Sequence, residues 1–160
     1  MPAAIRAPEP HPAAVDERSL TLANRLRPAL LHLARHLRRE VQTESVTAGQ
    51  VEILALVDHR PGLGINELAS LMSISAPSMS NAIDKLEAAG LAIRRREEPG
   101  DRRRVGISVT AAGARVTRWA RSNRTAWLAE RLSQLSPEHL AALEAAADAL
   151  DAIPGGPELG

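Results

Sequence analysis

One stretch of the chain, residues 105–109, shows an alternation in which Val105, Ile107 and Val109 are separated by Gly106 and Ser108, the pattern typical of a β-strand. Residues 105–109 read Val-Gly-Ile-Ser-Val, and residues 91–95 form a second short run, separated from the first by the turn-forming sequence Pro99-Gly100-Asp101. Elsewhere the apolar residues recur every three or four positions, which is the period of an amphipathic helix. The sequence therefore predicts a mainly α fold that contains one small β-hairpin.

Six helices are predicted around this hairpin, four before it and two after it. Leucines at three- and four-residue spacing place the first helix at about 19–42, where Pro28 must kink or restart it. Ser75 and Ser136 are favourable N-caps for the fourth and the sixth helix. Caps, glycines and prolines together set the other boundaries at about 47–59, 65–72, 75–89, 111–135 and 136–152.

Composition limits the class of protein. The 160 residues suffice for a single domain, expected at 18–153, between a disordered Pro- and Ala-rich tail (1–17) and a mobile tail at 154–160. The absence of cysteine excludes disulfides, thiolate nucleophiles and cysteine-based metal sites. No apolar run is long enough to span a bilayer and the first residues lack the regions of a secretion signal, so we expect a cytoplasmic protein with no membrane partner.

Basic charge is concentrated at the hairpin. The net charge of the chain is only +1, but six arginines fall between Arg94 and Arg104, against the three acids Glu97, Glu98 and Asp101, which leaves that segment at +3 (six minus three). Such a cluster is typical of a surface that binds nucleic acid. A solvated surface is the alternative explanation.

The third and fourth predicted helices, joined by a short turn, have the arrangement of a helix-turn-helix. Short polar side chains let the second of them approach base edges closely, where Asn pairs with adenine and Lys85 suits a phosphate. An ordinary amphipathic helical hairpin is the alternative. We expect six apolar residues of the pair to pack inward, Leu68, Leu71, Ile74, Met79, Ile83 and Leu86, and six others to be available to DNA, Ser75, Ala76, Ser78, Ser80, Asn81 and Lys85.

The basic hairpin that follows strengthens the DNA-binding interpretation. A wing that crosses the sugar-phosphate backbone needs a cation able to enter the minor groove, where negative potential is concentrated. Arg102, Arg103 and Arg104 supply that cation, and Arg96 belongs to the same wing. A carboxylate repels phosphate, so we interpret Asp101 as a residue that holds a neighbouring guanidinium in position.

Three segments together resemble the MarR family: residues 67–69 (Glu-Leu-Ala), residues 84–91 (Asp-Lys-Leu-Glu-Ala-Ala-Gly-Leu) and residues 101–110 (Asp-Arg-Arg-Arg-Val-Gly-Ile-Ser-Val-Thr). The resemblance extends from about Leu22 to Leu150. It implies a dimeric regulator in which Arg103 enters the minor groove, Asp101 positions it and residues 75–85 form the recognition helix. It also implies a winged helix-turn-helix at about 47–110 and dimerisation helices at about 19–42 and 111–152.

Two positions depart from the family pattern. Asn81 stands where members often carry arginine, so the base preference of a relative is not transferred to this chain. Gly64 stands where a Ser or Thr cap is common before the third helix, and glycine caps a helix almost as well, at a difference of a few tenths of a kcal/mol. The second departure leaves the expected fold intact.

His32 and His36 lie four residues apart on the first predicted helix, a spacing that allows a shared metal ion. No cysteine or nearby carboxylate completes such a site, so we expect no metal and no cofactor. Trp119 and Trp127 are the chain's aromatic residues, and core or dimer packing is the favoured interpretation for both. In the family the first helix borders a ligand cleft, so the resemblance makes His32 and His36 candidates for an effector pocket. Trp119 is a further candidate, because concave ligand sites tend to be lined by aromatic residues.

The predicted function is that of a homodimeric, sequence-specific regulator of transcription that binds double-stranded DNA at a pseudo-palindromic site. We expect a repressor relieved by a small-molecule effector. Two alternatives remain open: a DNA-bending protein without sequence preference, and a helical dimerisation module that does not bind DNA. An enzyme is disfavoured, because the sequence has no glycine-rich phosphate loop, no cysteine nucleophile and no histidine-carboxylate spacing suited to acid-base chemistry.

Overall fold

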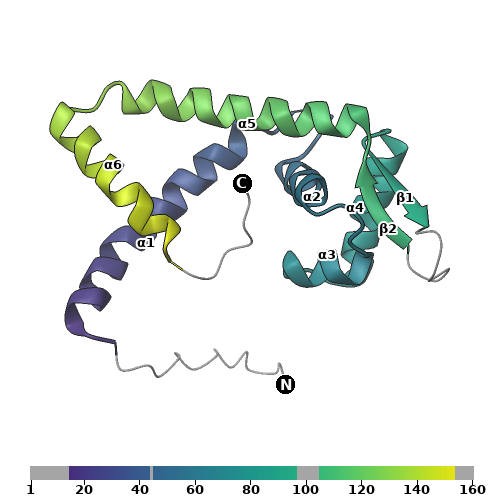
Figure 1. Cartoon of the computed structure of the whole chain (residues 1–160), viewed down its shortest axis with the longest axis horizontal. Helices are drawn as coiled ribbons and strands as arrows, with labels where there is room; N and C mark the ends of the chain where they lie inside the picture. Colours follow the sequence, from purple (N-terminus) through teal and green to yellow (C-terminus); the bar gives the residue numbers. More distant parts are fainter. Residues whose placement is uncertain (1–14, 44, 97–104, 154–160) are drawn as a thin grey trace, which may run out of the picture. The chain divides into compact units, whose positions relative to one another are not determined.

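The computed structural model describes residues 15–43, 45–96 and 105–153, and over these ranges the chain forms six helices and one antiparallel hairpin of two strands (Figure 1). The prediction of a mainly α fold with a small hairpin is confirmed. Of the expected tails at 1–17 and 154–160, residues 1–14 and 154–160 lie outside the described residues, and Glu17 already begins the first helix. In chain order the elements are α1 (Glu17–Arg39), α2 (Ala48–His59), α3 (Ile65–Leu71), α4 (Ala76–Ala88), β1 (Ala92–Arg96), β2 (Val105–Val109), α5 (Ala111–Leu132) and α6 (Pro137–Asp151).

Contacts divide the chain into two units, residues 1–35 and residues 36–160. The described part of the first unit is mostly α1, whose first turn is closed by Asp16: its carboxylate accepts hydrogen bonds from the amide (2.9 Å) and the hydroxyl (2.6 Å) of Ser19. These bonds lower the pKa of Asp16. Pro28 lies inside α1 without ending it, so the helix is not restarted there.

The second unit holds the buried core, to which α2, α3, α4 and β2 all contribute. Its largest fully buried side chains include Leu54, Leu56, Leu68, Met79, Ile83, Leu86 and Ile107. The prediction that Leu71 and Ile74 pack inward is wrong, because 38% and 41% of their surfaces are exposed. Helix α3 ends at Leu71 and the chain turns at Ser73, so the helical period that placed Ile74 on the inner face is broken before that residue. Leu71 is the last residue of the helix and remains partly exposed.

The hairpin pairs Ala92 with Val109 and Arg96 with Val105 at its two ends. The loop before α3 extends this pairing: the Gly62 amide donates to the Ile107 carbonyl (3.0 Å), and the Ile107 amide donates to the Leu63 carbonyl (2.9 Å). The backbones approach so closely that a Cβ atom on Gly106 would lie 2.7 Å from the Gly62 carbonyl oxygen. The β2 strand is thereby held against the body of the unit.

Three elements meet where α4 ends. Gly90, at φ 69°, ends the helix in the left-handed conformation: its amide bonds to the Glu87 carbonyl and the Leu91 amide to the Leu86 carbonyl, the two bonds of a Schellman motif. Thr110 then donates its hydroxyl hydrogen to the Gly90 carbonyl (2.7 Å) and caps α5. The end of α4, the start of β1 and the start of α5 therefore form one junction.

Helix boundaries differ from the predicted ones by a few residues. Helix α2 starts after Thr47, whose hydroxyl accepts from the Gln50 amide while the Gln50 side chain accepts from the Thr47 amide, a capping box. Helix α5 ends at Leu132, before the predicted end near residue 135, because the following turn is closed by tighter three-residue hydrogen bonds. It lies along one side of α2, with which it is in contact (Figure 1).

Candidate nucleic-acid interface

Helices α3 and α4 are joined by a turn of four residues, 72–75, that is tightly hydrogen-bonded. Ser73 has a φ of 53°, and the Ile74 amide donates to the Ala69 carbonyl (3.0 Å). Ser75 then caps α4: its hydroxyl oxygen accepts from the Ser78 amide (3.3 Å), and it donates to the Ser78 hydroxyl (2.8 Å). The result is a short helix-turn-helix whose second helix begins with exposed hydroxyl groups.

The six residues predicted to be available to DNA on α4 divide by exposure. Ser75, Ser78, Asn81 and Lys85 are exposed, whereas Ala76 and Ser80 are half-buried. Asn81 and Lys85 lie four residues apart, so they occupy one face of the helix. That face carries a donor-acceptor amide and a cation, the groups suited to a base edge and a phosphate.

A groove of about 560 Å³ runs beside this face. Ser78, Asn81 and Lys85 line one side of it, and the start of α2 lines the other. Arg38 also borders the groove and forms a two-pronged ion pair with Glu52, with nitrogen–oxygen distances of 2.7 and 2.6 Å. Those hydrogen bonds, and the negative charge of the carboxylate, raise the pKa of Arg38.

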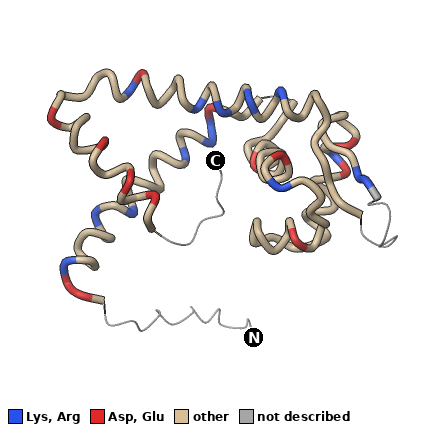
Figure 2. Tube along the Cα trace, viewed as in Figure 1, with Lys and Arg blue, Asp and Glu red and all other residues tan. Residues whose placement is uncertain are grey.

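The described basic residues of the hairpin follow one another along β1 (Figure 2), but their side chains differ in surroundings. Arg94 points toward α4, where it forms ion pairs with Asp84 (2.7 Å) and with Glu87. Arg95, the next residue, is exposed. Of the residues predicted for the wing, Asp101, Arg102, Arg103 and Arg104 lie outside the described residues, as does the side chain of Arg96.

Comparison with known proteins decides the family. A model of the MarR family matches residues 46–105. An HTH-type transcriptional regulator of Mycobacterium tuberculosis is 33% identical over 132 residues, which cover 82% of this chain and 92% of that protein. The chain belongs to the MarR family.

Solved structures agree with this assignment. A crystal structure of a putative transcriptional regulator from Pseudomonas aeruginosa is 28% identical, with a TM-score of 0.73 over 86% of this chain and 95% of that one. A mutant of S. aureus MepR, solved bound to an oligodeoxyribonucleotide, shares the fold, with a TM-score of 0.60 at 23% identity over 81% of this chain and 94% of that one. The protein is thus a DNA-binding transcriptional regulator of the MarR family and not an enzyme.

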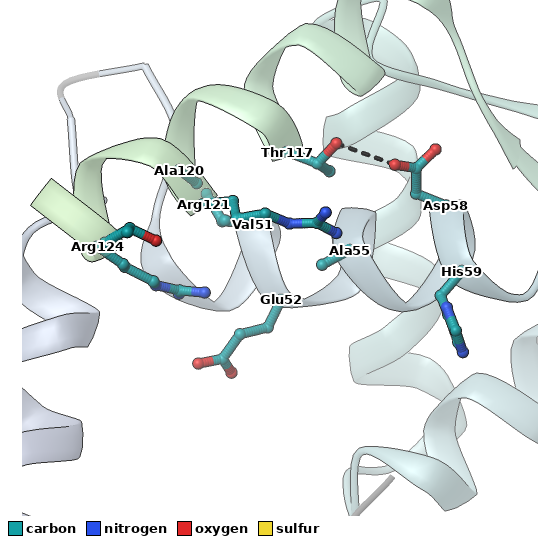
Figure 3. A pocket seen from close by; sticks show the side chains of 10 residues that line it. Val51, Glu52, Ala55, Asp58, His59, Thr117, Ala120, Arg121 and Arg124 are labelled. Carbon is teal, nitrogen blue, oxygen red and sulfur yellow. Dashed lines mark hydrogen bonds between the residues drawn. The ribbon is translucent and has the colours of Figure 1, made fainter. Parts of the chain in front are cut away.

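A cavity of about 410 Å³ lies between α2 and α5 of this MarR-family chain. Figure 3 shows its lining: Arg121 and Arg124 come from α5, and the Thr117 hydroxyl meets the Asp58 carboxylate at 3.1 Å. Neither His36 nor Trp119, two of the predicted effector-pocket residues, lines this cavity. The third, His32, is an exposed residue of α1 in the first unit.

Trp127 does not line this cavity and packs against two other side chains. Its ring stacks on the ring of His36, with centroids 5.6 Å apart and an interplanar angle of 16°. The guanidinium carbon of Arg131 lies 4.0 Å from the centre of the same ring. Trp119, by contrast, is 43% exposed. Core or dimer packing was the favoured interpretation for both tryptophans, and packing within the chain fits Trp127 better than Trp119.

Sequence reasoning missed the roles of Arg94 and Arg38, because it counted both as part of the chain's general basic charge. One signal was available for Arg94: two acids, Asp84 and Glu87, stand three residues apart on a helix that is expected to approach phosphates. Acids on such a helix need a cation nearby. Within the described ranges, no helix is long and apolar enough to cross a membrane, and no cluster of three potential ligands could hold a metal ion.

Proposed function

We propose that this MarR-family regulator binds a pseudo-palindromic DNA site as a homodimer, with α4 of each subunit in the major groove, and represses transcription until a small molecule binds. The observation that carries the proposal is the exposed face of α4, where Ser75, Ser78, Asn81 and Lys85 are free of the core. A helix that starts with small hydroxylated residues is able to approach base edges closely. Asn81 would read an adenine, and Lys85 would contact a phosphate.

The wing would supply the second contact. β1 and β2 follow α4 directly, and the Thr110–Gly90 hydrogen bond ties the base of the hairpin to the end of that helix. The segment between the two strands contains Arg102, Arg103 and Arg104 in sequence, and Arg96 is the last residue of β1. By the resemblance to the family, Arg103 would enter the minor groove and Asp101 would hold its guanidinium.

A second copy of the chain would cover two helices that bury nothing here. Neither α1 nor α6 contains a buried residue, although each carries exposed leucines. An amphipathic helix gains stability by burying its apolar face, so these faces favour a homodimer. Leu143, 47% exposed on α6, is a suitable test position: Leu143→Asp should shift the protein from dimer to monomer in analytical ultracentrifugation, whereas Glu144→Gln should leave the dimer intact.

Relief by an effector would use the cavity between α2 and α5. Two cations from α5, Arg121 and Arg124, line it together with apolar groups such as Val51 and Ala120. This lining suits a small acidic molecule with an apolar body. The molecule would relieve repression only if it bound one spacing of the two recognition helices more tightly than the other. His32, His36 and Trp119 remain a second candidate set.

The test is retention of a short duplex from upstream of the gene, with random DNA as competitor, for the intact protein and for Arg103→Ala. Each phosphate contact contributes about −0.9 to the slope of log affinity against log salt, so retention should fall steeply as salt rises. Arg103→Ala should weaken binding about ten-fold, or about 1.4 kcal/mol, which is near the lower end of the range of about 1–3 kcal/mol for a lost specific contact. Arg18→Ala, which removes an exposed arginine from α1, is the charge-matched control.

The other outcomes identify the alternatives. Retention that random duplex abolishes would indicate a DNA-bending protein without sequence preference. No retention at any salt concentration would refute DNA binding and favour the dimerisation module. Equal losses for Arg103→Ala and Arg18→Ala would show that overall charge, and not the wing, determines affinity.

A further inference from the structure

Arg94 lies where β1 meets the recognition helix, and three interactions hold it there. One guanidinium nitrogen pairs with the Asp84 carboxylate at 2.7 Å, and the other pairs with Glu87. The backbone amide of Arg94 also donates to the Glu87 carboxylate, at 2.8 Å. A single residue of the hairpin thus binds two acids of α4 through both its side chain and its main chain.

Arg94 offsets one of the two negative charges of Asp84 and Glu87 at this contact. Asp84 and Glu87 lie on a helix that would enter a groove lined by phosphates, where two bare carboxylates would weaken binding. The side chains of Arg94 and Glu87 are only 29% and 28% exposed, so the pair is partly shielded from solvent and its charge is engaged within the protein. The arginine most closely joined to the recognition helix is therefore not available to a phosphate.

We propose that Arg94 is a positioning residue: it fixes the orientation of the wing relative to the recognition helix, so that both engage DNA at once. This inference rests on the proposed DNA-binding mode. A two-stranded hairpin alone is marginally stable, so its direction depends on what it is tied to. Thr110 ties the base of the hairpin to the end of α4, and the loop before α3 holds β2 through the backbone bonds of Ile107. Arg94 adds an attachment on β1, the other strand.

Attachments on both strands fix the direction of the hairpin more closely than attachments on β2 alone. If the hairpin is held in place, the wing arginines would reach the minor groove in the same binding event in which α4 enters the major groove. The wing would then lose little conformational freedom on binding. Without Arg94 the wing would have to be ordered when DNA binds, and affinity would fall. The loss would appear through the wing and not through a phosphate contact of Arg94 itself.

Glu87→Ala tests whether the contact between Glu87 and Arg94 raises or lowers the affinity for DNA. Removal of a negative charge close to DNA should tighten binding if electrostatic repulsion alone matters. The positioning role gives the opposite result, because Arg94 loses the partner of both its guanidinium and its amide: affinity should fall about five-fold. Thermal unfolding of the free protein, at equal concentration, checks that the variant remains folded. Tighter binding by a folded Glu87→Ala protein would overturn the proposal.

A double-mutant cycle tests whether Arg94 affects DNA binding through the wing. Arg94→Ala should lower affinity for the upstream duplex about ten-fold in the intact protein, but less than about two-fold when Arg103→Ala has already removed the wing contact. In the Arg103→Ala background, Arg94→Ala should also leave the salt slope unchanged, whereas loss of a phosphate contact would reduce its magnitude by about 0.9. Arg95→Ala is the matched control, because it removes the same charge one residue along the strand, from a side chain on the opposite face.

The outcomes separate this inference from the proposed function. Equal ten-fold losses in both backgrounds, or equal losses for Arg94→Ala and Arg95→Ala, would overturn the positioning role while leaving DNA binding intact. Arg94→Lys keeps the charge but cannot make the fork to two carboxylates, so it should resemble Arg94→Ala and not the intact protein. Failure of the intact protein to retain DNA would instead refute the proposed function.

Discussion

Substitution of Gly113 by alanine should destabilise the protein, although alanine is the better helix former. Gly113 lies in the first turn of α5, where this helix passes the junction between α4 and β1. A Cβ atom added there would lie 2.1 Å from the carbonyl oxygen of Leu91, 3.1 Å from its carbonyl carbon and 3.5 Å from a methyl carbon of Leu54. The first two distances are far below ordinary contact, and the clashing atoms belong to the backbone.

The backbone of Leu91 has little freedom to move away. Its carbonyl accepts from the Thr110 amide at 3.0 Å, and its amide donates to the Leu86 carbonyl at 2.8 Å. Overpacking typically costs about 1–3 kcal/mol, and a clash with fixed backbone belongs at the upper end. Replacing glycine by alanine in a helix by itself raises the free energy of unfolding by about 1 kcal/mol. We therefore expect a net loss of about 2 kcal/mol, which lowers the midpoint of thermal unfolding by about 4–8 °C in a chain of this length.

Gly49→Ala is the matched control, because Gly49 also lies in the first turn of a helix and has no atom within 4 Å of the added Cβ position. It should be neutral or stabilising by up to about 1 kcal/mol. Both variants should be compared with the parent protein by calorimetry at one protein concentration, since dimerisation makes the midpoint depend on concentration. If Gly113→Ala proved as stable as Gly49→Ala, the close approach of α5 to Leu91 would be refuted.

Three further perturbations follow from single contacts. Ser73→Gly should stabilise the protein by about 0.5–1 kcal/mol in urea titrations, because Ser73 has a φ of 53° that glycine adopts without strain; a destabilised variant would contradict this. Thr110→Val should lower the free energy of unfolding by about 1–2 kcal/mol, because it removes both the α5 cap and the hydrogen bond to Gly90. An unchanged unfolding midpoint would refute the role of the hydroxyl. The folded-state pKa of Asp16 is lowered by its bonds to Ser19, so its stabilising effect is present above the ordinary carboxyl pKa and is lost as pH falls through the lowered value. Protection of the Ser19 amide, its exchange rate relative to that of an unstructured peptide at the same pH, should therefore fall at acid pH, and Asp16→Asn should abolish that dependence; persistence of the dependence in the variant would assign it to another group.

Most elements of the fold were predictable because their signals are local. Caps at Ser75, Thr110 and Ser136 are bonded to amides three residues away, and the structure has all three as N-caps. The alternation in residues 105–109 likewise gives the second strand its observed bounds. Ile74 was misplaced because a period read along the chain continues past the end of a helix, whereas the real helix stops at Leu71.

The candidate interface was predictable in part. The exposed positions of Ser75, Ser78, Asn81 and Lys85 agree with the helical period of α4, which is also a local property. The partners of a long charged side chain are not local, because a guanidinium on a flexible stem reaches whichever acid the packing brings near it. Arg94 is ten residues from Asp84 in sequence, and Arg38 is fourteen residues from Glu52.

The sequence by itself thus determined the order and type of the elements, the helix-turn-helix and the segments that resemble the MarR family. Short-range hydrogen bonds and side-chain periods specify these features without reference to the rest of the chain. Only the tertiary structure decided that Arg94 binds the recognition helix, that Gly113 passes Leu91 too closely for a side chain, and that a cavity opens between α2 and α5. These features depend on distances between elements, and those distances are set by how the core packs.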